Sequence, residues 1–287
     1  PYESLQNYLV RWANEPDPPI RKTGNVWLIA SQEDAWRLLA RNLTNDDLNR
    51  FETVALEVLG ELDPAFELPL DQRFAASIYG KELTHSGYLR KGISEMLALM
   101  AALSAEIEFI ADRTGEEVAR QVVWQLMEKT KNNMHLWASL ANLLPLLAEA
   151  APEIFLDAVE VGLSGDDPVL LGLFQDRDTG AALMASSPHT GLLWALETLA
   201  WHPDYLSRAA LNLTRLTRLD PGGQLANRPG SSLRDIFICW HPHTTASLTS
   251  RLSVLDIIRK RESGVAWHLL MSLLPKRHSA VSPTHGT

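Results

Sequence analysis

Helix start signals followed by apolar stripes at helical spacing recur along almost the whole of this 287-residue chain. A hydroxyl residue followed three positions later by an acid satisfies free N–H groups in a first helical turn, and such pairs begin at Ser31, Thr44, Thr114 and Ser232. Residues 25–30, NVWLIA, are the best strand candidate in the chain. Since amphipathic helices bury their stripes by packing on one another, the pattern predicts an all-α fold.

The breakers between these signals set the expected elements. We expect helices at residues 3–14, from 31, at 44–62, 69–80 and 86–104, from 114, at 134–150 with a kink at Pro145, and at 169–174 inside a loop that spans 162–188. Helices, a strand and turns in the first part suggest a winged-helix-like unit or linker at residues 1–65. Residues 66–287 then form an α-helical repeat domain.

A short repeat indicates how the helices are joined. The tripeptide Trp-His-Pro occurs at 201–203 and again at 240–242, and weaker helix–Pro–helix joints surround Pro152 and Pro275. The irregular offsets predict a degenerate helical-hairpin solenoid of the TPR or HEAT kind. We expect both tryptophans to be buried at equivalent joints, because stacked hairpins must fill the space between them.

Apolar stripes flank both copies of the tripeptide at i, i+3, i+4 and i+7 or similar spacing. They are Leu206, Ala210, Leu213 and Leu216 after the first copy, Leu233, Ile236, Phe237 and Trp240 before the end of the second, and Leu248, Leu252, Leu255 and Ile258 after it. Each stripe is expected to face the core.

The second copy lies in ICWHPHTT, which places Cys239, His241 and His243 at alternate positions. Alternate residues share a face in a strand, not at a helix end, and a structural zinc site takes four ligands. The chain has one cysteine. We therefore interpret the segment as a helical joint, predict no metal site, and note that a single cysteine fits a reducing, cytoplasmic location.

Motifs that carry chemistry are missing from the sequence. There is no phosphate-binding Gly-x-x-x-x-Gly-Lys-Ser/Thr, no Gly-x-Ser-x-Gly and no His-Glu-x-x-His. We assign no catalytic, cofactor-binding or metal-binding residue and expect no cofactor. An acid cluster in a helical hydrolase would leave no sequence motif, so that alternative stays open.

Net charge and hydropathy limit the classes of partner that we expect. The net charge is −9, which disfavours nucleic acid as a ligand, since phosphate neutralisation needs clustered Lys and Arg. The one basic run, Arg259-Lys260-Arg261, is interpreted as a solvated helix end. The longest apolar run, at 96–103, is too short for a membrane span.

Three stretches resemble the helical region that follows the ATPase in bacterial STAND proteins, the NLR-like antiphage NTPases. They are LWASLANLLPLLAEAAP at 136–152, TGLLWALE at 190–197, and the segment from DPGG at 220–223 through ANRP at 226–229 to the second Trp-His-Pro; SQEDAW at 31–36 fits the linker or winged-helix position.

The resemblance implies a protein with an N-terminal effector, a central NTPase and a C-terminal helical sensor that binds a phage protein and thereby releases the NTPase to oligomerise. This sequence lacks the NTPase and the effector, and it begins with Pro1 rather than Met. We therefore expect the sensing part of a longer protein, with a protein ligand and with oligomerisation only in the parent. The alternative is a helical-repeat scaffold or adaptor without a sensing role. The sequence identifies no partner-binding residue.

Overall fold

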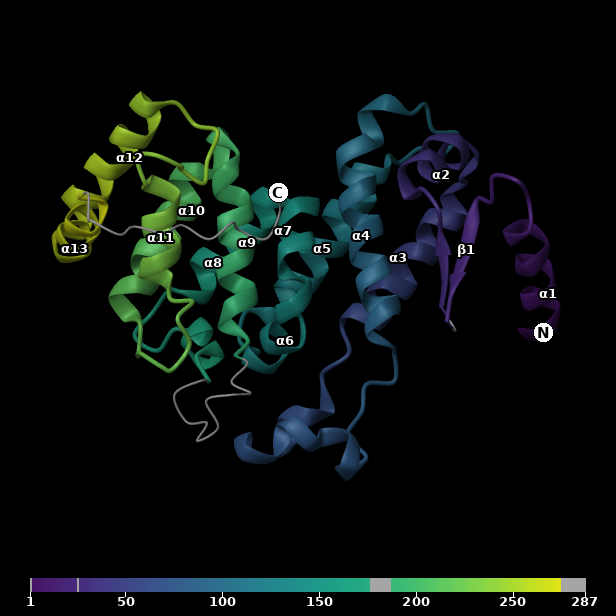
Figure 1. Cartoon of the computed structure of the whole chain (residues 1–287), viewed down its shortest axis with the longest axis horizontal. Coiled ribbons are helices and arrows are strands. Elements are labelled where there is room, and N and C mark those ends of the chain that lie inside the picture. Colours follow the sequence, from purple (N-terminus) through teal and green to yellow (C-terminus); the bar gives the residue numbers. More distant parts are fainter. Residues whose placement is uncertain (1, 25, 176–186, 275–287) are drawn as a thin grey trace.

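The computed structural model describes residues 2–24, 26–175 and 187–274, and it is mostly helical (Figure 1). Its α-helices are α1 (Tyr2–Ala13), α2 (Gln32–Leu39), α3 (Asn45–Leu59), α4 (Gly87–Leu103), α5 (Gly115–Thr130), α6 (Met134–Ser139), α7 (Leu144–Ala150), α8 (Pro152–Gly162), α9 (His189–Trp201), α10 (Pro203–Leu219), α11 (Pro229–Phe237), α12 (Leu248–Arg261) and α13 (Ser263–Leu273). Short 3₁₀ helices are η1 (Ala40–Asn42), η2 (Pro64–Glu67), η3 (Leu70–Tyr79), η4 (Ser104–Glu106), η5 (Ala141–Leu143) and η6 (Val169–Leu173). The predicted helical class is confirmed.

The single sheet of the described chain is an antiparallel hairpin of β1 (Ile20–Thr23) and β2 (Val26–Ile29), in which Ile20 pairs with Ile29. The predicted strand is β2. Sequence reasoning missed β1, because its residues IRKT are mostly exposed and show no apolar alternation. Gly24 follows β1 with φ +59°, a backbone conformation that glycine adopts without steric cost.

Side-chain caps begin the helices at three of the four positions that the sequence predicted. Thr44 and Thr114 form complete capping boxes with Asp47 and Glu117, and Ser31 caps α2. Ser232 does not cap a helix: α11 begins earlier, at Pro229, and Ser232 lies inside it. Residues 69–80 form the predicted helix, but as 3₁₀ turns that end at the left-handed Gly80.

The predicted kinked helix at 134–150 is three elements, α6, η5 and α7. Pro145 lies in the first turn of α7, where a missing N–H leaves no hydrogen bond unmade, so the chain restarts a helix there instead of bending one. Gly191 in α9 crosses this region so closely that a Cβ would lie 1.9 Å from the Ala141 carbonyl oxygen. The close crossing therefore requires glycine at this position of α9.

Consecutive helices alternate between two packed layers. In one layer α4, α7, α9 and α11 lie side by side in that order, and in the other α3, α5, α8, α10 and α12 do the same (Figure 1). The helix α13 packs against α11 and α12 at one end of the long axis, and α1 lies at the other. One continuous core runs between the layers from Trp36 to Leu269, with Trp137 and Phe155 fully buried in it.

The two Trp-His-Pro copies have different structures. In the first, α9 ends at Trp201 and Pro203 opens α10, as predicted, and Pro152 opens α8 in the same way. In the second, α11 ends at Phe237 and α12 begins only at Leu248. The predicted helical joint is therefore wrong there; the further joint expected at Pro275 lies outside the described residues.

The loop between α11 and α12 instead folds over the end of α9. Thr245 donates two hydrogen bonds to the Trp201 carbonyl, from its N–H at 3.0 Å and its hydroxyl at 2.8 Å. The ring of His243 stacks on Trp201 with centroids 6.1 Å apart. Trp240 is 47% exposed, because Ile238 takes the buried position, so the prediction of two equivalent buried tryptophans is wrong.

The apolar stripes around the two Trp-His-Pro copies also differ in how far they are buried. All four residues of the stripe in α10 are buried, and so are Leu233, Ile236 and Phe237 in α11. In α12 only Ile258 of the predicted four is fully buried, whereas Leu248 and Leu252 are exposed. The expectation that this last stripe faces the core is wrong for those two leucines. The boundary predicted at residue 65 stays a prediction.

Candidate functional site

A surface groove follows α5 between α3 and α8, and we call it the α5 groove. It consists of two cavities of about 510 and 210 Å³ that share Trp124 and Ile154. The other residues that line it are Glu52, Arg113, Glu117, Arg120, Gln121, Met127, Glu128, Lys131, Asp157, Ala158 and Val161.

The helical period of α5 explains why a tryptophan lies in this groove. Val118, Val122 and Leu126 follow one another at helical spacing along the buried face and are fully buried. Trp124 falls on the opposite face, next to Arg120 and Glu128, and remains 48% exposed. A large aromatic residue on the polar face of an amphipathic helix was the signal that sequence reasoning missed.

The charged walls of the α5 groove are largely paired. Arg113 contacts Glu52 at 2.9 Å, and Lys131 contacts Glu128 at 2.7 Å. The second carboxylate oxygen of Glu52 accepts a hydrogen bond from Gln125 at 2.9 Å. Both signs of charge border an apolar centre, an arrangement that suits a polypeptide segment better than a polyanion.

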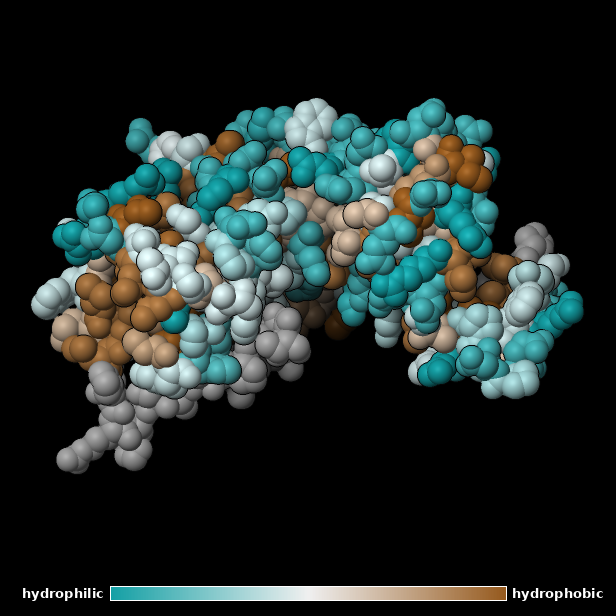
Figure 2. Space-filling view, turned by 90° about the horizontal axis from the view of Figure 1, so that it is seen from above, coloured by the Kyte–Doolittle hydropathy of each residue, from teal (hydrophilic) through white to brown (hydrophobic). Residues whose placement is uncertain are grey.

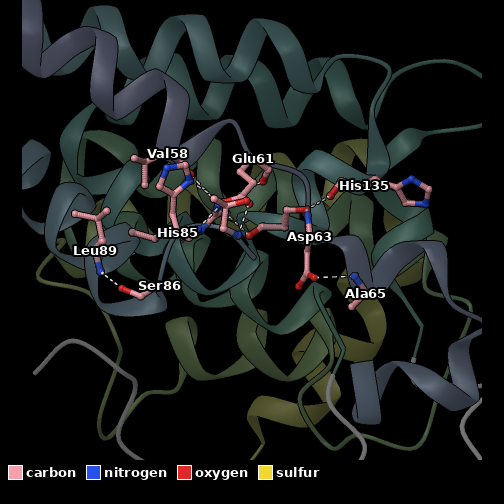
Figure 3. A network of polar contacts seen from close by, with 11 residues as sticks. Val58, Glu61, Asp63, Ala65, His85, Ser86, Leu89 and His135 are labelled. Carbon is pink, nitrogen blue, oxygen red and sulfur yellow. Dashed lines mark hydrogen bonds and ion pairs between the residues drawn. The ribbon is translucent and has the colours of Figure 1, made fainter. Parts of the chain in front are cut away.

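An arm, residues 62–86 with η2 and η3, projects from the layers at the lower edge of Figure 1. Figure 3 shows the polar contacts at its base. The Glu61 carboxylate accepts hydrogen bonds from the backbone N–H groups of Thr84 at 2.5 Å and His85 at 3.2 Å, and it lies 2.8 Å from His85 Nδ1. The two ends of the arm are thus fastened together.

Burial raises the pKa of the Glu61 carboxyl, but the hydrogen bonds from Thr84 and His85 outweigh burial and lower this pKa to about 2. The nearby guanidinium of Arg90 is buried and donates to the carbonyl oxygens of Val58 at 2.8 Å and Ser139 at 3.1 Å. All of these partners are structural groups of the chain itself, so the network fixes the arm in place.

The distal part of the arm is apolar at its surface. Phe66 stacks on His135 with centroids 5.6 Å apart, and Arg73 lies over Phe66 at 4.9 Å. Farther out, Phe74 and Ile78 are 80% and 82% exposed. The arm therefore combines a fastened base with an exposed apolar tip, which makes it a second candidate site.

Two acids inside the molecule bear on the hydrolase alternative. Burial raises the pKa of both Glu197 and Asp235, a shift that a hydrogen bond from Ser232 opposes at Glu197. Neither acid lines the α5 groove or a third cavity of about 380 Å³ beside Trp201. None of these three cavities therefore combines its volume with a carboxyl group of raised pKa at these two positions.

The residues of ICWHPHTT do not converge either. Cys239 is exposed, and His243 is buried with its ring edge-on to His241 at 5.6 Å. In the described ranges, no group of three or more His, Cys, Asp or Glu residues is placed to hold a metal ion.

Comparison with known proteins gives this chain no relative. No family model, no curated protein and no solved structure matches it. Among residues 2–24, 26–175 and 187–274, no helix has both the length and the apolar character that crossing a bilayer requires.

Proposed function

We propose that this chain is a non-catalytic protein-recognition module, built as a degenerate solenoid of helical hairpins. The alternation of consecutive helices between two layers, from α4 to α12, supports the solenoid. The helices α1 to α3 and the β1–β2 hairpin supply the elements of a winged-helix-like unit before it.

The observation that carries the proposal is Trp124 in the α5 groove. A half-exposed tryptophan offers a protein ligand a large apolar contact, and tryptophan is among the residues that most often dominate binding energy at interfaces. The paired charges around it supply a polar rim. We infer that the groove holds a segment of a protein ligand along α5.

The resemblance to STAND proteins suggests where such a module acts. Its stretches at 136–152 and 190–197 form α6, η5, α7, the start of α8 and much of α9. We propose that the chain is the ligand-sensing region of a larger cytoplasmic STAND NTPase in antiphage defence. A helical scaffold or adaptor is the alternative. The two differ in whether ligand in the groove changes nucleotide hydrolysis by the parent protein.

A peptide library displayed on particles tests the groove directly. We expect selected peptides to bind the chain with micromolar Kd, and Trp124→Ala to weaken binding by at least tenfold, about 1.4 kcal/mol or more. Tyr88→Ala is the matched control, because Tyr88 is a 74% exposed aromatic residue on α4, in the other layer. Both variants should keep the wild-type unfolding midpoint. Peptides that bind equally well to Trp124→Ala would contradict the assignment of the groove.

The second part of the proposal is that the chain catalyses no reaction. If the chain were a hydrolase, its acid pair would be Glu197 and Asp235, the carboxyls whose pKa values burial raises. We expect the wild-type protein and the Glu197→Gln variant to show the same background hydrolysis of model ester, phosphoester and glycoside substrates. Activity lost in that variant with the fold intact would support the hydrolase instead.

A further inference from the structure

The end of the molecule formed by α12 and α13 carries an exposed apolar surface, which we call the end face. Figure 2 shows apolar side chains gathered at this end of the molecule. The residues of the end face are Leu248 and Leu252 of α12 and Trp267, Leu270, Met271 and Leu274 in and after α13, all of them more than 40% exposed.

The helix α13 is apolar on both sides. Ala266 and Leu269 are buried towards the rest of the molecule, while the four exposed residues from Trp267 to Leu274 recur at i, i+3, i+4 and i+7. A helix that is apolar all round is normally buried on most of its sides, as α9 is here, where only the side with Thr190, Trp194, Thr198 and Trp201 is half-exposed. Contiguous exposed apolar residues on a protein surface often mark an interaction site, so the end face is a candidate contact for another helix.

The opposite end of the long axis carries a helix with a matching apolar stripe. In α1, Leu5, Tyr8 and Trp12 are 53%, 57% and 40% exposed at i, i+3 and i+7. The rings of Tyr8 and Trp12 pack edge-on with centroids 6.1 Å apart, so they form one continuous apolar surface. The side of α1 that contains Leu9 and Ala13 is half-buried, and α1 packs against β1.

The charges around the two surfaces are opposite in sign. Residues 2–17 contain three acidic residues and one basic residue, whereas residues 248–274 contain four basic and two acidic ones, in a chain of net charge −9. Asp256 pairs with both Arg259 and Lys260 at 2.6 Å, and its neighbour Arg261 is exposed at the end of α12. Helix α1 itself is balanced, with Glu3 and Arg11, and the acidic excess comes from Glu15 and Asp17 in the turn after it, whereas the end formed by α12 and α13 has an excess of basic residues.

We propose that α1 of one molecule docks onto the end face of a second copy, so that molecules associate head to tail. An amphipathic helix laid on an apolar surface through i, i+3 and i+7 anchors is a common recognition mode. Figure 1 places α1 and α13 at opposite ends of the molecule, so the contact forms between molecules. A heterologous contact of this kind is not closed by a two-fold axis and extends into chains.

A symmetric contact between two end faces is the main competitor. It would bring the basic ends of two α12 helices together, and like charges at an interface oppose association. A head-to-tail contact instead brings the acidic turn after α1, with Glu15 and Asp17, towards an end of the molecule with an excess of basic residues. It should therefore weaken as salt is raised.

Sedimentation velocity over a range of concentrations tests the proposal. We expect wild-type protein to form a concentration-dependent series of species, and Trp12→Glu and Trp267→Glu each to remain monomeric at tenfold higher concentration. An equimolar mixture of the two variants should form a 1:1 dimer and nothing longer, because each molecule retains the surface that the other has lost. Tyr88→Glu is the control: this 74% exposed aromatic residue of α4 lies on neither surface, so the variant should associate as the wild type does.

The same measurements can overturn the proposal in three ways. If the wild-type protein stays monomeric at every concentration, the proposed contact does not form. Dimers of Trp12→Glu that Trp267→Glu cannot form indicate the symmetric end-face contact. A mixture that stays monomeric, while circular dichroism shows both variants folded, excludes pairing of α1 with the end face.

Discussion

The two Trp-His-Pro copies have the same sequence but different structures. The difference lies in where the preceding helix ends. In the first copy α9 continues to Trp201, and Pro203 opens the next helix directly. In the second copy α11 stops at Phe237, and ten residues without a helix precede α12. A short repeat therefore fixes a joint only when the helix before it reaches the repeat.

The copies are nevertheless coupled, because the second one packs on the first. Thr245 caps the carbonyl end of α9 at Trp201, and His243 stacks on the Trp201 ring. Free carbonyl groups at a helix end need partners, and here a loop 44 residues further on supplies them. The copies thus occupy two halves of one contact rather than equivalent sites in two repeats.

The largest expected difference between the copies lies in the helices that follow them. Leu213 of α10 is fully buried, whereas Leu252 of α12 is 55% exposed. We expect Leu213→Ala to lower the free energy of unfolding by about 3 kcal/mol, from lost transfer energy plus a cavity, and Leu252→Ala by less than about 0.5 kcal/mol. Urea denaturation measures both, at a protein concentration where the wild type is monomeric. Equal losses would mean that α12 is packed as α10 is.

The tryptophans themselves should differ by a smaller amount. Trp201 is half-buried against His243, and Trp240 is 47% exposed in the loop. Replacement of Trp201 by alanine should cost about 2 kcal/mol of unfolding free energy, less than for a fully buried tryptophan, and replacement of Trp240 under about 1 kcal/mol. The midpoints of urea unfolding report the difference. A larger loss for Trp240→Ala would restore the joint that the sequence predicted.

Local patterns predicted most helices, because their signals lie within one or two turns. Thr114 caps α5, and the stripe from Val118 to Leu126 is buried, as its spacing requires. The predicted burial of Trp240 at the end of its stripe is wrong, because Ile238 is buried instead. Which of the two residues is buried depends on how the loop packs against α9. Helical spacing alone cannot rank two apolar residues that compete for one position.

The candidate sites could not be predicted from the sequence, for a different reason. The α5 groove joins residues as far apart as Glu52, Trp124 and Val161, on three helices that only the tertiary fold brings together. The anchor of the arm joins Glu61 to His85 across 24 residues. Of these features, the sequence shows only an aromatic residue on a polar face, which becomes a site once its neighbours are known.

The coupling between the copies should depend on pH through His243. Burial lowers the pKa of His243, the charge of Asp235 opposes this shift, and the charge of His241 reinforces it. Because the unfolded chain then binds the proton more tightly, the free energy of unfolding should fall as pH drops below about 6.5 and be insensitive to this group above it. His243→Gln should show a shallower loss between pH 7 and 5 than the wild type in urea titrations. A wild-type slope in the variant would assign the pH dependence to other groups.

The smallest expected effect tests the cap on α9. The Thr245 side chain is exposed, and its hydroxyl donates to the Trp201 carbonyl at 2.8 Å. Thr245→Val keeps the shape but removes this donor, so it should cost about 0.5–1 kcal/mol of unfolding free energy, while Thr245→Ser should cost less because it keeps the hydroxyl. The effect should vanish when the loop no longer packs on α9. In a double-mutant cycle with Trp201→Ala, we therefore expect a coupling of about 0.5 kcal/mol or more between the two positions. Strict additivity of the two losses would show that the copies fold independently, each with its own helix end.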